Sequence, residues 1–173
     1  RLCYGDTEVD VSRKFRIAAH ESGGDTVPFV SVCSGEGGYA QVIVGPQDVP
    51  QTAGRIMFVD TGITFDSYFC DFDRNFAIGH TDDASRHAYE VVYAATGAGL
   101  ATARSGATCA DLFHAMNAVM EAGGALGNDV GRLGHGLGSQ LTEWPSNTAW
   151  DDTVLQPGMV ITLEPGMTYA PGK

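Results

Sequence analysis

Two apolar runs in this chain each lead directly into an acidic residue. Residues 56–59 are followed by Asp60, and residues 159–163 are followed by Glu164. Both runs are short and apolar, so both predict strands. Burying an ionised carboxylate at a strand end is costly unless a cation or another partner meets it. The fold is therefore expected to supply such a partner twice, although for Asp60 alone a turn or cap aspartate is the commoner alternative.

A second acidic pattern lies in residues 69–76, where Asp71 and Asp73 are separated by one residue. Residues two apart on a strand point to the same face, so these two carboxylates are expected side by side. Carboxylates gathered on one face repel each other unless a cation lies between them. The alternative is an ion pair with Arg74 or a neighbouring strand, which accounts for Asp73 better than for Asp71.

One histidine of the five, His135, lies between two glycines and has a third glycine, Gly138, nearby. Such a segment lets the backbone approach a cofactor or substrate while it presents one imidazole. The other four histidines are expected to be ordinary surface or core residues. Three carboxylates with one imidazole suit Mn²⁺, Co²⁺, Fe²⁺ or Zn²⁺. The candidate metal ligands are therefore Asp60, Asp71, His135 and Glu164.

Composition and motifs exclude several other classes of function. The net charge of −11 argues against nucleic acid and anionic membranes as partners, and no apolar run has the length of a membrane span. The four cysteines are far apart and form no CxxC pair, which indicates reduced thiols and a cytoplasmic protein. The chain contains no HExxH zinc motif, no G-x-S-x-G elbow and no phosphate-binding GxxxxGK[ST] loop.

The order of predicted elements is a helix, then strands, two helices and further strands, which favours an α+β fold over a doubly wound sheet. One domain is expected to cover residues 1–173. A capping box of Thr108 and Asp111 marks the start of the third helix. The remaining elements are listed by range: a helix at 8–20, strands at 27–33 and 42–44, antiparallel strands at 55–60 and 65–78 joined through 62–64, a helix from 82 or 83 to 104, the third helix as far as 123, and strands around 135, at 141–144 and at 159–164.

Taken in order, these strings resemble those of the pita-bread metallohydrolases, peptidase family M24, which include methionine aminopeptidase, Xaa-Pro aminopeptidase, prolidase and creatinase. The eleven-residue spacing of Asp60 and Asp71, Gly-His-Gly-x-Gly at His135 and Glu-Pro-Gly at Glu164 carry the likeness over nearly the whole chain. The resemblance implies a curved antiparallel sheet covered by helices. It also implies two divalent ions: Asp60 would bind one, Asp71 would bridge, and His135 and Glu164 would complete the second. Asp73 replaces the threonine of Asp-x-Thr-Arg and is the weaker candidate.

The resemblance further implies a metal-dependent hydrolase that cleaves a C–N bond with a bridging metal-bound water, as Xaa-Pro aminopeptidase and prolidase do. Glu143 and Glu164 are the candidate catalytic acids, although Glu143 alone could be a loop acid packed beside Trp144. Tyr68 and Thr142 are the candidate substrate-binding residues. The expected partner is a peptide or a small amide, and a homodimer is left open.

Two departures from the family pattern widen the choice of activity. The chain stops at Lys173 without the glutamate that follows Glu-Pro-Gly in the family, and both ends are expected to be cut. The peptidases also carry histidines at the positions of Thr142 and of the segment 41–44. The alternatives are a small-molecule hydrolase of the creatinase or ectoine hydrolase type, a lyase on the same fold, or a non-catalytic binding module. The intact ligand strings count against the last.

Overall fold

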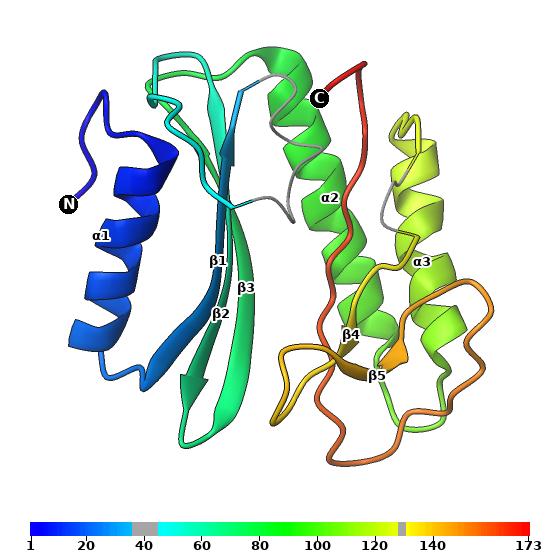
Figure 1. Ribbon diagram of the computed structural model, residues 1–173. Coiled ribbons are helices and arrows are strands. Elements are labelled where there is room, and N and C mark those ends of the chain that lie inside the picture. Colours follow the sequence, from blue (N-terminus) through cyan, green and yellow to red (C-terminus); the bar gives the residue numbers. More distant parts are fainter. Residues whose placement is uncertain (36–44, 128–130) are drawn as a thin grey trace. The chain divides into compact units, whose positions relative to one another are not determined.

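A helix, strands, two helices and short strands follow one another in this chain, which confirms the predicted α+β class (Figure 1). The structure is a computed structural model that describes residues 1–35, 45–127 and 131–173, so the strand predicted at 42–44 lies outside the described residues. The chain divides into two units, Arg1–Asp82 with Gly172–Lys173, and Asp83–Pro171. No helix in the described part is both long and apolar enough to cross a membrane.

The first unit packs one helix on a three-stranded antiparallel sheet. Helix α1 (Glu8–Glu21) begins at a capping box in which Thr7 and Asp10 bond each other's backbone N–H groups. The strands β1 (Thr26–Ser34), β2 (Ile56–Phe65) and β3 (Tyr68–Ala77) lie in that order. Figure 1 shows α1 against one face of the sheet, where its Val11 joins a valine-rich core. The core residues of this unit are Val11, Val27, Val30, Val32, Met57 and Val59.

The turn predicted through residues 62–64 is wrong, and so is the placing of Asp60 at a strand end. Strand β2 continues to Phe65, and the hairpin turns at Asp66 and Ser67, whose φ angles are 49° and 70°. Two turn residues with positive φ match the twist of antiparallel strands, and an aspartate tolerates that conformation. Gly62 is therefore a strand residue, paired with Asp71 on β3.

The second unit is built on two helices that lie side by side, α2 (Asp83–Thr102) and α3 (Cys109–Ala122) (Figure 1). The predicted capping box of α3 is confirmed: the N–H of Asp111 donates to the Thr108 hydroxyl at 3.0 Å, and the N–H of Thr108 donates to the Asp111 carboxylate at 2.8 Å. Hydrogen bonds to the Asp111 carboxyl, first from the backbone N–H of Thr108 and then from its side chain, lower the pKa of Asp111. The core between the helices and the following segments consists of Val91, Ala95, Ala107, Cys109, Leu112, Met116, Met120, Leu133 and Leu155.

The last strands of the second unit differ from the prediction, since β5 begins two residues later than the strand expected at 141–144. Only β4 (His135–Gly136) and β5 (Glu143–Ser146) are regular, and residues 159–164 contribute a single bridge, from Ile161 to Gly136. The predicted strand at 159–164 is therefore wrong as a regular element. The physical reason is that the N–H of His135 donates to the side-chain hydroxyl of Thr162 at 2.9 Å, and this bond interrupts the backbone ladder.

Candidate metal centre

Three carboxylates meet on one face of the sheet in the first unit. Asp60 on β2 is directly opposite Asp73 on β3, and Asp71 is opposite Gly62, two residues further along. One oxygen of each of Asp60, Asp71 and Asp73 lies within 4.8 Å of the others, and all three residues are half-buried. The prediction that Asp71 and Asp73 share a face is confirmed. Asp73 was the weaker ligand candidate on sequence, yet its carboxylate lies within the same 4.8 Å of the other two.

An ion pair with Arg74 is the alternative that the sequence analysis gives for Asp73. The Arg74 guanidinium lies over the Phe72 ring, 5.2 Å from its centroid, and one of its N–H groups donates to the backbone carbonyl of Asp73 at 2.6 Å. Arg74 and Phe72 belong to the opposite face of the strand from the carboxylates. Three half-buried carboxylates so close together repel one another, and a cation bound between them would offset that repulsion.

The second unit brings together the other two candidate ligands. His135 is only 3% exposed, and its Nε2 lies 3.3 Å from Oε1 of Glu164. Its Nδ1 lies 2.8 Å from the carbonyl oxygen of Gly136. A carbonyl can only accept, so Nδ1 carries a proton and Nε2 is the nitrogen that faces Glu164. Proteins commonly fix a metal-binding histidine through such a bond from its other ring N–H.

The Glu164 carboxylate itself supports a cation at this place. Its Oε1 is buried and accepts no hydrogen bond from the described residues. A buried carboxylate oxygen without a donor costs about 1–3 kcal/mol or more. A cation between this oxygen and Nε2 of His135 would remove that cost, so the donor chemistry fits a metal ion.

The three glycines around His135 lie in close contact with other residues of the second unit. A methyl group on Gly134 would collide with the carbonyl oxygen of Thr162. One on Gly136 would come within 2.5 Å of the Trp144 carbonyl, and one on Gly138 within 2.8 Å of the Glu143 carboxylate. Close backbone contacts within the fold therefore account for Gly134 and Gly136, whereas the atoms beside Gly138 belong to the end of the Glu143 side chain.

Three further candidates have structural settings of their own. Oε1 of Glu143 accepts hydrogen bonds from the backbone N–H of Gln140 at 2.8 Å and from the Ser139 hydroxyl at 3.3 Å, so this carboxylate holds its loop closed. Thr142 is exposed, and Tyr68, the first residue of β3, is 67% exposed. The catalytic role of Glu143 and the substrate contacts of Thr142 and Tyr68 remain predictions.

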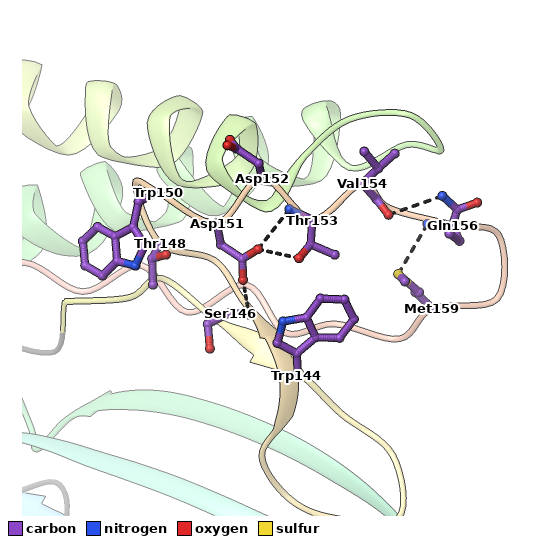
Figure 2. A pocket seen from close by; sticks show the side chains of 10 residues that line it. All are labelled: Trp144, Ser146, Thr148, Trp150, Asp151, Asp152, Thr153, Val154, Gln156 and Met159. Carbon is purple, nitrogen blue, oxygen red and sulfur yellow. Dashed lines mark hydrogen bonds between the residues drawn. The ribbon is translucent and has the colours of Figure 1, made fainter.

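Sequence reasoning missed an open cavity of about 910 Å³ in the second unit. Figure 2 shows Asp151 among its lining residues, bonded to the N–H of Ser146 at 3.1 Å and to the N–H and hydroxyl of Thr153. Burial alone would raise the pKa of Asp151, but these hydrogen bonds outweigh it and lower the pKa. Neither His135 nor Glu164 lines the cavity. The Asp-x-Thr pattern at 151–153 is typical of a turn in which the aspartate side chain bonds the backbone two residues on. It could have predicted the bonds from Thr153 to Asp151.

Comparison with known proteins identifies the family. A family model described as metallopeptidase family M24 matches residues 2–173. The chain belongs to this family. A relative named probable dipeptidase PepE, from Mycobacterium tuberculosis, is 35% identical over 173 residues, which are 99% of this chain and 46% of the relative. The Xaa-Pro dipeptidase of Pyrococcus furiosus is 33% identical over 118 residues, 68% of this chain and 34% of the relative.

Solved structures of the M24 family support the same assignment. The dipeptidase PepE from Mycobacterium ulcerans matches with a TM-score of 0.93 and 31% identity, over 99% of this chain and 46% of that one. The prolidase from Pyrococcus furiosus matches with a TM-score of 0.91 and 28% identity, over 99% and 51%. The predicted pita-bread fold is therefore confirmed. The chain spans about half or less of the length of these relatives.

Proposed function

We propose that this chain carries the metal-binding core of a prolidase-type metallopeptidase, with Asp60, Asp71, His135 and Glu164 as the ligands of two divalent ions. Mn²⁺, Co²⁺, Fe²⁺ and Zn²⁺ all suit oxygen donors with one imidazole. The observation that carries the proposal is the pair of His135 and Glu164, because Nε2 of the buried His135 and a buried oxygen of Glu164 face each other at 3.3 Å and a cation between them could bind both. Membership of family M24 and the acidic group of the first unit support it.

The roles of the residues follow from their surroundings. Ions held here would supply Lewis acidity toward an amide carbonyl. His135 keeps its tautomer through the Gly136 carbonyl, and Glu164 offers a carboxylate that can accept a proton. Glu143 would move a proton only after releasing the bonds from Gln140 and Ser139. Residues 1–173 would act together as one catalytic domain, and a cytoplasmic location and a homodimer remain predictions.

The proposed substrate is a dipeptide with proline in the second position, because the relatives include proteins named Xaa-Pro dipeptidase. Tyr68 and Thr142 are the proposed substrate contacts. A second candidate is a small-molecule hydrolase of the creatinase or ectoine hydrolase type. It is favoured by Thr142, which stands where the peptidases carry a histidine. A threonine hydroxyl can donate a hydrogen bond to a peptide carbonyl, but it lacks the positive charge of a protonated imidazole. A lyase on the same fold is a further candidate with the same ligands.

Metal titration followed by product analysis tests the proposal. Metal-free whole protein is titrated calorimetrically with Mn²⁺ and then assayed on an Xaa-Pro dipeptide, ectoine and a sulfonium carboxylate. We expect Mn²⁺ binding and metal-dependent release of proline from the dipeptide. His135→Ala should lose both, whereas His114→Ala, at an exposed position on α3, should lose neither. Absence of Mn²⁺ binding by the wild type would defeat the enzyme proposal, and activity on ectoine or the sulfonium carboxylate alone would replace the peptidase with the second candidate or the lyase.

A further inference from the structure

Asn147, just after β5, is a fully buried polar residue that joins the segments carrying His135 and Glu164. Its backbone N–H donates to the carbonyl of Gly134 at 2.9 Å, and its own carbonyl accepts from the N–H of Leu133 at 2.8 Å. Its side-chain Nδ2 donates to the carbonyl of Thr162 at 2.9 Å and lies 3.5 Å from the carbonyl oxygen of Leu133. One residue therefore bonds both the segment before His135 and the segment before Glu164.

These bonds occupy a gap in the backbone ladder between residues 133–135 and 162–164. The N–H groups of Thr162 and Glu164 donate to the carbonyls of His135 and Leu133, at 2.8 and 3.0 Å. In a regular antiparallel ladder, the N–H groups of Leu133 and His135 would donate back to the carbonyls of residues 162–164. Here they donate elsewhere. The N–H of Leu133 goes to Asn147, and the N–H of His135 goes to the hydroxyl of Thr162. Because the N–H of His135 bonds the Thr162 hydroxyl, the Thr162 carbonyl accepts a hydrogen bond from the Asn147 side chain instead.

The orientation of the Asn147 amide is fixed by its neighbours. Both atoms near Nδ2 are carbonyl oxygens, which can only accept, so the NH₂ group must face them. Oδ1 then points away, and it is buried without a hydrogen-bond donor among the described residues. A buried amide oxygen without a donor is unfavourable. We attribute this cost to the NH₂ group, which must face two carbonyls to join the segments that carry His135 and Glu164.

We propose that Asn147 and Thr162 are positioning residues that hold His135 and Glu164 at the separation a shared metal ion requires. This inference rests on the proposed function. Neither side chain acts on the metal or substrate itself. Asn147 fixes the Thr162 backbone, two residues before Glu164, while the Thr162 hydroxyl fixes the N–H of His135. Partners that orient metal ligands in this way typically change metal affinity about 10- to 100-fold when removed.

Four variants of the whole protein test this inference by calorimetric titration of the metal-free form with Mn²⁺. Asn147→Ala removes the bridging amide, and Thr162→Val removes the hydroxyl that accepts from His135. Thr162→Ser keeps that hydroxyl and is the conservative rescue. Thr148→Val is the matched control, because Thr148 is buried in the same loop and its hydroxyl has no partner among the described residues.

We expect Asn147→Ala and Thr162→Val to weaken Mn²⁺ binding about 10- to 100-fold, with Thr162→Ser and Thr148→Val close to wild type. The absorption spectrum of bound Co²⁺, which reports ligand geometry, should change in the first two variants only. Equal affinities in Thr162→Val and Thr162→Ser, or equal losses in Asn147→Ala and Thr148→Val, would overturn the inference while leaving the proposed function in place. A wild type that binds no metal would overturn both. If Asn147→Ala fails to fold, the two Thr162 variants still decide the matter.

Discussion

Replacing Gly134 by alanine should test how tightly the segment before His135 is packed. The added methyl group would collide with the Thr162 carbonyl and come within 2.6 Å of Nδ2 of Asn147. Gly134 also has a φ of +132°, which costs an alanine about 1–3 kcal/mol. Overpacking against a backbone atom that cannot move aside adds about 1–3 kcal/mol. The free energy of unfolding should therefore fall by about 2–6 kcal/mol.

Gly106→Ala is the matched control in the same unit. Gly106 has a φ of +90°, and nothing lies within 4 Å of the position its Cβ would take. It carries the backbone cost without the collision, so it should be about 1–3 kcal/mol less destabilising than Gly134→Ala. Urea unfolding followed by circular dichroism measures the difference, about 0.5–1.5 M between the two midpoints if the urea dependence is about 2 kcal/mol per molar. Equal midpoints would refute the claim that the Thr162 backbone leaves no room beside Gly134.

Three further predictions concern single side chains. Asp71→Ala should abolish Mn²⁺ binding in a calorimetric titration while Asp73→Ala should weaken it far less, because Asp71 is a proposed metal ligand and Asp73 stands in place of the family's threonine. Equal losses would make Asp73 a ligand as well. Asp151→Ala should lower the free energy of unfolding at pH 7 by about 1.5–3 kcal/mol, because it removes a charged hydrogen-bond acceptor. Since the folded pKa of Asp151 lies below its ordinary value of 3.8, that stabilisation is present above pH 3.8 and is lost as the pH falls through the folded pKa, so acid unfolding curves of the variant and wild type should converge there. Burial raises the pKa of Cys109 to about 11, so iodoacetamide at pH 8 should alkylate the exposed Cys3 in the folded protein and reach Cys109 only after unfolding, as mass spectrometry would show.

Features encoded by neighbouring residues could be predicted from the sequence. The capping box of Thr108 and Asp111 located the start of α3, and the alternation of a strand placed Asp71 and Asp73 on one face. The four ligand strings indicated the family because their order is itself a property of the sequence. These signals depend on spacing along the chain, and tertiary packing does not alter them.

Features that depend on distant contacts could not be predicted. Gly62 looked like a turn residue because glycine is common in turns, but β2 runs through it and the hairpin turns at Asp66 and Ser67. Residues 159–164 looked like a strand, but the Thr162 hydroxyl replaces a backbone acceptor, a choice made only when His135 is already beside it. Asn147 carried no signal at all, since a loop asparagine is ordinarily a surface residue.

The central proposal is that Asp60, Asp71, His135 and Glu164 are the ligands of two divalent ions. Anomalous diffraction from crystals of the whole protein grown with Mn²⁺ tests it most directly. We expect two anomalous peaks, one bound by Asp60 and Asp71 and the other by His135 and Glu164. Peaks at only the acidic group of the first unit, or no peak beside His135 and Glu164, would contradict it.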